Sequence, residues 1–230
     1  MEAMEVTFTL ATPMMLNSEY PVHLDALIAF AVSRDAEKQG SDHPWEDAND
    51  LSDIFDRTAG EGKRWVWKAS QLVVTQRHLS RQLYSMTNAV RRTDTGRFFG
   101  DLEAGYWRPR SKLNPETFRI QTRKGQQRGY QMYLVTADVC EVKAWAVGEM
   151  DAVRYYLGTI DHLGKGGNNG YGKIVETSVS ACADEDQWRL RWMPEGEPGK
   201  PGVSYAPVNG CLQQPYWEDY RHHRVMEPVI

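Results

Sequence analysis

Apolar side chains recur along the chain at spacings that predict two helices, each preceded by a β-strand. Val6–Leu10 alternates apolar with polar residues, as in a half-buried strand, and Pro13 ends it. After Pro21, helical spacing predicts a helix from near Val22, with one apolar face made of Leu24, Leu27, Ile28, Ala31 and Val32. A second face at this spacing, Met150, Val153, Leu157, Ile160 and Leu163, predicts a helix that Gly164 ends.

Further strands are predicted between and after these helices. Arg64–Gln76 and Tyr171–Ser180 each indicate one strand, and Gly129–Gly148 is β-prone over the length of one long or two short strands. In the tail, the segments that we expect to be most structured are Arg189–Pro194 and Gln214–Trp217. This order predicts an α+β fold, a β-α-β-β-α-β core of the ferredoxin-like (RRM-like) kind in a single domain over 1–230.

Two segments do not fit the core pattern. Residues 40–62 are acidic and predict a surface insertion with at most one short helix, near Asp47–Phe55. Residues 81–128 are basic and glycine-containing with weak periodicity, which indicates a thumb-like excursion in the form of a long hairpin.

Composition excludes several classes of protein. With 230 residues, 41% hydrophobic and 25% charged, the chain is typical of a globular protein, and its longest apolar run, Ala26–Val32, is too short to cross a membrane. The acidic N-terminus lacks the pattern of a secretory signal, so a cytoplasmic location and no membrane partner are expected. Cys140, Cys182 and Cys211 are isolated, so we expect no disulfide, metal site or cofactor.

Charge is divided sharply along the chain. Residues 63–128 carry fifteen Lys or Arg against four acids, a balance of +11 in a chain whose net charge is -4. Aromatic residues are interleaved with them: Trp65, Trp67, Tyr84, Phe98, Phe99, Tyr106 and Trp107. A solvated arginine-rich face is the alternative, but cations that neutralise phosphates beside rings that stack bases favour nucleic-acid binding. The candidate contacts are Arg91, Arg92, Arg97, Arg108, Arg110 and Lys112.

A glycine-rich loop follows the second predicted helix. Leu163–Lys173 has five glycines in eleven residues, which lets a backbone approach a ligand and aim N–H groups at phosphate oxygens. Ile174 stands where a P-loop needs Ser or Thr, and Asn169 where a dinucleotide fingerprint needs glycine, so both motifs are excluded. A flexible connector would not need the flanking lysines. The candidate contacts are Lys165, Gly166, Gly167, Asn168, Asn169, Gly170, Tyr171 and Lys173.

The helix, this loop and the strand after it resemble the glycine-rich loop of RAMP-superfamily CRISPR proteins. Leu10–Pro13 with Val22–Ala29 resembles the opening strand and helix of RAMP subunits, notably the Cas-five-like subunit of type IV systems, and Pro215–Trp217 resembles that subunit's tail. Residues 40–62 and 81–128 show no such similarity. Asn168 and Asn169 stand where many RAMP loops carry a further basic residue.

The resemblance implies a non-catalytic subunit that caps the five-prime handle of the CRISPR RNA (crRNA) and contacts the first backbone subunit. Guide pairing then reads the target sequence. The implied partners are crRNA and the backbone, large and processing subunits, and target DNA is a further partner to consider.

Two alternatives stay open. Some relatives are metal-independent crRNA endoribonucleases, for which His23 and His162 are candidate acid or base and Lys165 a candidate for stabilising charge. The other is a backbone subunit of the Cas-seven-like kind, although the short chain and single glycine loop favour it less.

Overall fold

The computed structural model describes residues 1–15, 20–60, 64–74, 78–86, 100, 130–216 and 221–230. The chain divides into two compact units, Met1–Ser80 with Val135–Ile230, and Arg81–Leu134. The bounds of the second unit are close to those of the predicted basic excursion. Its residues 87–99 and 101–129 lie outside the described part, as do the candidate contacts from Arg91 to Lys112.

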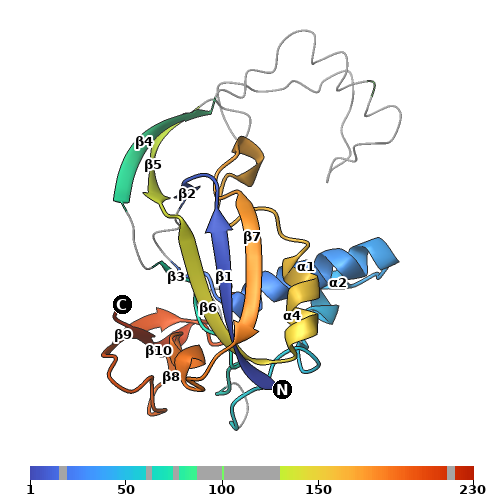
Figure 1. The fold of residues 1–230 in the computed structure, drawn as a ribbon, viewed down its shortest axis with the longest axis vertical. Helices are drawn as coiled ribbons and strands as arrows, with labels where there is room; N and C mark the ends of the chain where they lie inside the picture. The colour runs from blue at the N-terminus through green and yellow to red at the C-terminus, as the bar shows by residue number, and fades with distance from the viewer. Residues whose placement is uncertain (16–19, 61–63, 75–77, 87–99, 101–129, 217–220) are drawn as a thin grey trace. The chain divides into compact units, whose positions relative to one another are not determined.

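A four-stranded antiparallel sheet forms the centre of the first unit (Figure 1). Its order is β3-β6-β1-β7, where β1 is Glu2–Leu10, β3 is Val73–Val74, β6 is Glu141–Gly148 and β7 is Ile174–Ala181. β1 pairs with β6 on one side and with β7 on the other. The alternation predicted for the first strand is confirmed, since every second residue from Met4 to Leu10 is buried.

Two helices cover one face of this sheet (Figure 1). α1, Leu24–Gln39, follows β1, and α4, Met150–Leu157, follows β6. α1 ends at Gly40 in the left-handed conformation, where the Gly40 N–H bonds back to the last helical turn. The main core joins the sheet to both helices through Val6, Phe8, Leu24, Ile28, Val142, Ala144, Val153 and Leu157. The predicted α+β class is confirmed.

Two smaller antiparallel assemblies complete the described strands. One is a sheet of the order β8 (Met193–Pro194), β10 (His223–Pro228), β9 (Tyr205–Gly210). The sequence indicated structure in the tail but did not predict this sheet. β2 (Met14–Met15), β5 (Tyr130–Asp138) and β4 (His78–Met86) form another. Gly129–Gly148 therefore supplies two strands, β5 and β6.

The acidic segment is not the surface insertion that the sequence predicted. Its acidic side chains are mostly exposed, but four apolar ones enter the main core: Ala48, Leu51, Ile54 and Phe55. Its helix, α2, is Pro44–Asp47 rather than near Asp47–Phe55, because Pro44 occupies the first turn, where a missing N–H costs nothing.

Two predicted elements are shorter than expected. Within the described residues 64–74 the strand is limited to β3, because the N–H groups of Ser70, Gln71 and Leu72 bond to three separate partners, Trp145, Leu190 and Val22. The helix predicted to run to Gly164 ends at Leu157. Gly158 is a poor helix former, and the chain beyond it turns to pair with the start of β7.

Candidate functional site

The glycine-rich loop is the closed end of a hairpin between α4 and β7. The Leu163 N–H donates to the Gly172 carbonyl at 2.8 Å, and His162 and Lys173 form a β-bridge. Leu163 is fully buried and fixes one end of the hairpin to the core. The helix-to-strand direction predicted for this loop is confirmed, and its ends are not those of a loose connector.

The segment after β1 supports the loop from a second side. Thr12 Oγ1 donates to the Gly170 carbonyl at 2.7 Å and accepts from the Lys173 N–H at 2.9 Å. The Gly172 N–H donates to the Pro13 carbonyl at 2.8 Å. Sequence reasoning missed Thr12, because nothing local indicates a hydrogen bond between residues 158 apart.

Positive φ angles at four glycines shape the turn: Gly164, Gly166, Gly170 and Gly172. At Gly172 a Cβ atom would overlap with the Leu163 carbonyl oxygen, and at Gly164 it would lie 2.5 Å from the Met15 carbonyl oxygen. These two positions thus require glycine for both space and conformation. Residues Gly167–Asn169 form one 3-10 turn between them.

The turn leaves a row of backbone donors without backbone acceptors. The N–H groups of Asn169 and Gly170 bond within the turn, whereas those of Gly166, Gly167 and Asn168 donate to no backbone acceptor among the described residues. Such successive N–H groups are typical of anion-binding turns.

The side chains around this row are mainly exposed. Asn168, Asn169 and both loop lysines are exposed. The half-buried ring of Tyr171 lies against Gly166, so only part of it is available to a base. The structure therefore brings together all eight loop residues that the sequence selected. The arrangement places backbone N–H donors and two lysines on one exposed turn.

The candidate nuclease residues are not brought together. His162 is half-buried beside Gly167, and Lys165 is exposed in the loop. His23 is fully buried, and neither ring nitrogen has a hydrogen-bond partner among the described residues. Burial, with a smaller contribution from the Arg191 charge, lowers the pKa of His23 well below its ordinary value. The His23 ring is 0% exposed, so it is not accessible to RNA in this structure.

A buried polar cluster surrounds His23 instead. Its ring stacks on Tyr216 with centroids 4.4 Å apart. Tyr216 donates to Asp25 at 2.6 Å, and Arg191 donates to the Tyr216 hydroxyl at 2.8 Å. Arg191 also donates to the Trp67, Ala69 and Leu212 carbonyls. These hydrogen bonds connect the tail to α1. Tyr216, which belongs to the tail segment Pro215–Trp217, therefore has a structural role.

Comparisons with known proteins identify a family. None of the helices in the described residues has the length and apolar composition needed to cross a membrane. No curated protein matches the sequence. The family model described as CRISPR type IV associated protein Csf3 matches residues 2–228. Because that match spans almost the entire chain, the chain belongs to the Csf3 family of CRISPR type IV associated proteins.

Proposed function

We propose that this chain is a non-catalytic, crRNA-binding subunit that caps the five-prime handle of the guide RNA and contacts the backbone subunit. The family supports the setting, a type IV complex with other Cas subunits. The observation that carries the RNA contact is the row of N–H groups of Gly166, Gly167 and Asn168, fixed on a braced hairpin between Lys165 and Lys173. Backbone donors and ammonium groups bind phosphate without reading sequence.

A ferredoxin-like core of the RAMP kind is part of the same proposal. Numbering the four sheet strands in chain order gives 4-1-3-2, with α1 after the first strand and α4 after the third. These are the strand order and helix positions of that unit. The loop then lies between the second helix and the fourth strand, as the resemblance implies.

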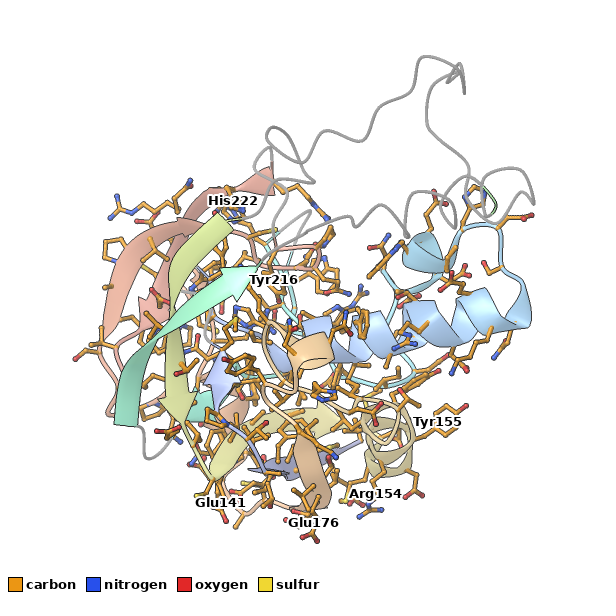
Figure 2. The ribbon with its side chains drawn as sticks, turned by 90° about the horizontal axis from the view of Figure 1, so that it is seen from above. Glu141, Arg154, Tyr155, Glu176, Tyr216 and His222 are labelled. Atoms are coloured by element: carbon orange, nitrogen blue, oxygen red, sulfur yellow. The ribbon has the colours of Figure 1, made fainter. Side chains whose placement is uncertain are left out.

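The open face of the sheet is a less suitable place for RNA. Thr9 pairs with Glu141 on one side and with Glu176 on the other, so both carboxylates lie on the face away from α1 (Figure 2). On the same face the Lys143 ammonium is already paired with Glu5 at 2.7 Å. Phosphates would meet net negative charge there, which favours the loop as the RNA contact.

Binding to a synthetic RNA with the cognate repeat sequence tests the proposal. Lys165→Ala with Lys173→Ala removes two cations, so affinity should fall, and the slope of log K against log salt should decrease by roughly 0.7 per lysine. The matched control is Lys38→Ala, an exposed lysine in the last turn of α1. Affinity and slope unchanged in the double variant would contradict the loop as the RNA contact.

A metal-independent endoribonuclease is the second candidate, because His162 lies beside Gly167 of the loop. Incubating the protein with repeat RNA and a 2′-deoxy control, without metal, separates the two functions. The binding-only proposal predicts no specific cleavage. Cleavage lost in the deoxy control and in His162→Ala would show an enzyme.

A further inference from the structure

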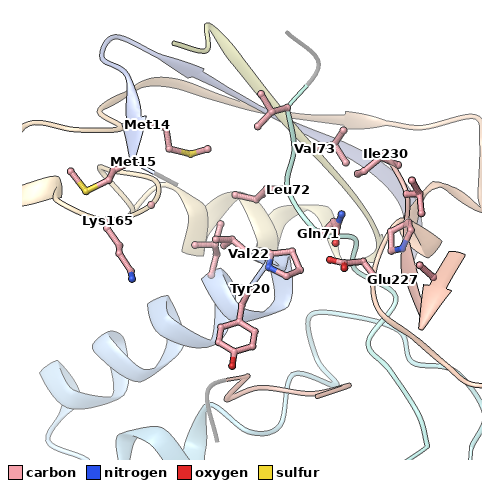
Figure 3. A pocket seen from close by; sticks show the side chains of 17 residues that line it. Met14, Met15, Tyr20, Val22, Gln71, Leu72, Val73, Lys165, Glu227 and Ile230 are labelled. Carbon is pink, nitrogen blue, oxygen red and sulfur yellow. The ribbon is translucent and has the colours of Figure 1, made fainter. Parts of the chain in front are cut away.

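A cavity of about 850 Å³ lies beside the glycine-rich loop, between the start of α1, β3 and the end of β10 (Figure 3). Most of its lining is aliphatic, including Met14, Met15, Val22, Leu27, Leu72 and Val74. Tyr20 is its single aromatic lining residue within the described part of the chain. Lys165 reaches it from the loop, and Gln71 and Glu227 lie together away from that lysine (Figure 3).

Gln71 and Glu227 present acceptors that the described residues leave unused. The Gln71 side chain is only 5% exposed, and its Oε1 has no hydrogen-bond partner. A buried carbonyl without a donor costs about 1–3 kcal/mol, so a missing partner is indicated. The half-buried Glu227 carboxylate takes part in none of the ion pairs between described residues. Gln71 therefore offers a neutral acceptor, and Glu227 a negatively charged one, to a group that enters the cavity.

The cavity also borders an edge of the main sheet. β3 stands last in the order β3-β6-β1-β7, and its residues pair with Lys143 and Val142 of β6. No described strand lies along the other side of Val73 and Val74. An edge strand with one free side can accept an extended segment through main-chain hydrogen bonds.

These features favour a protein segment over a nucleotide. Among the described lining residues a base would find one aromatic ring, Tyr20, and no second ring to stack on its other face. Aliphatic pockets along an edge strand instead fit alternate apolar side chains of a peptide. A lysine or arginine in that peptide would form an ion pair with the Glu227 carboxylate and donate a hydrogen bond to Gln71 Oε1.

We propose that this cavity receives an extended segment of another subunit of the complex, apolar along one side and carrying one Lys or Arg that pairs with Glu227 and Gln71. The inference deepens the proposed function, since the segment would lie next to RNA held at Lys165. The protein segment and the RNA would then contact the chain at adjoining sites, with Lys165 between them.

Photo-crosslinking in the assembled complex tests the occupant. Benzoylphenylalanine is introduced in place of Leu27, a half-buried residue that lines the cavity. In the control protein it is introduced in place of Tyr155, a residue of α4 that is 59% exposed. The complex is co-expressed with its neighbouring subunits. We expect the photoreactive residue at position 27 to crosslink to one protein subunit, at a segment that contains apolar residues and a Lys or Arg. A crosslink to RNA instead, or none in a complex that assembles, would overturn the proposal.

Charge reversal tests the pairing separately. Glu227→Lys should weaken association with the crosslinked subunit at least tenfold, and reversing the crosslinked Lys or Arg to Glu should restore it. The control is Glu176→Lys on β7, the edge strand of the main sheet farthest from β3. It should change association less than twofold. Unchanged association in Glu227→Lys overturns the pairing. Should that variant not fold, Glu227→Gln is expected to weaken association severalfold.

The two proposals fail differently. Repeat-RNA binding by the isolated chain depends on the loop lysines and should be the same in Glu227→Gln. A chain that binds RNA but shows no effect at Leu27 or Glu227 refutes only the subunit contact. Subunit contact without RNA binding refutes only the proposed function.

Discussion

The hydroxyl group of Tyr216 donates a 2.6 Å hydrogen bond to Asp25, a carboxylate 191 residues away in sequence and fully buried in the first turn of α1. Arg191 contacts both residues, donating to the same hydroxyl at 2.8 Å and placing its guanidinium 3.5 Å from Asp25 Oδ2. One buried carboxylate therefore ties the tail to the helix that follows β1. The stability of the folded chain should depend on this connection.

Removing the Tyr216 hydroxyl tests the first bond. Tyr216→Phe keeps the ring stacked on His23 but deprives Asp25 of a donor, so the free energy of unfolding should fall by about 2 kcal/mol. Urea unfolding measures this. Tyr155→Phe, at a ring 59% exposed, should change stability by less than about 0.5 kcal/mol. Equal effects of the two variants would mean that the buried hydroxyl is energetically unimportant.

Arg191→Met should be more damaging than Tyr216→Phe. It leaves the Asp25 carboxylate buried without a cation and takes the guanidinium donor away from the carbonyls of Trp67, Ala69, Trp192 and Leu212, a loss of about 3–5 kcal/mol. Adding Asp25→Asn removes the uncompensated charge and should recover part of the loss. A double-mutant cycle of unfolding free energies measures the coupling. Additive losses would show that the two charges do not interact.

The sequence predicted the elements better than their ends and partners. Alternation from Val6 to Leu10 located β1, and helical spacing located α1, because each signal lies within a few neighbouring residues. The end of α4 and the length of β3 depend on hydrogen bonds to distant segments, which spacing cannot reveal. The burial of Leu51 and Phe55 was hidden by the acids around them.

The candidate site shows the same division. Glycine and lysine content identified the loop, and its hairpin ends followed from the helix before it and the strand after it. Thr12, which braces the loop, and Arg191, which fixes the tail, gave no local signal, since an isolated Thr or Arg in a sequence is usually exposed. His23 misled for the opposite reason, because histidine suggests chemistry wherever it occurs.

The buried imidazole should make stability depend on pH. The unfolded chain takes up a proton at His23 near pH 6.5, but burial lowers the pKa of the folded ring, so acid favours the unfolded chain below pH 6.5. His23→Phe removes this contribution and two unpaired ring nitrogens. The variant should be about 1 kcal/mol more stable than the parent at pH 7, and its advantage should grow by up to about 1.4 kcal/mol per pH unit below pH 6.

Thermal or urea unfolding of both proteins between pH 7.5 and 5 makes the comparison. An advantage that stays constant with pH would show that His23 takes up its proton equally well in the folded and unfolded chains. Any RNA cleavage should also survive His23→Phe, since the ring is out of reach of RNA.

Two glycines of the loop provide the last prediction, because they share a backbone conformation but differ in the space around them. Gly170 has a φ of 83° with no atom within 4 Å of an added Cβ, so Gly170→Ala should cost about 1 kcal/mol of conformational strain. Gly172 has a φ of 62°, and its Cβ would overlap with the carbonyl oxygen of Leu163, the residue whose N–H closes the hairpin. Gly172→Ala should therefore cost about 3 kcal/mol and weaken RNA binding, whereas Gly170→Ala should leave binding within about twofold. Stability from urea unfolding and affinity for the repeat RNA, measured on both variants, separate the two effects. If Gly172→Ala folds as stably as Gly170→Ala, the hairpin closure at Leu163 does not constrain the loop, and the preorganised row of N–H donors loses its physical basis.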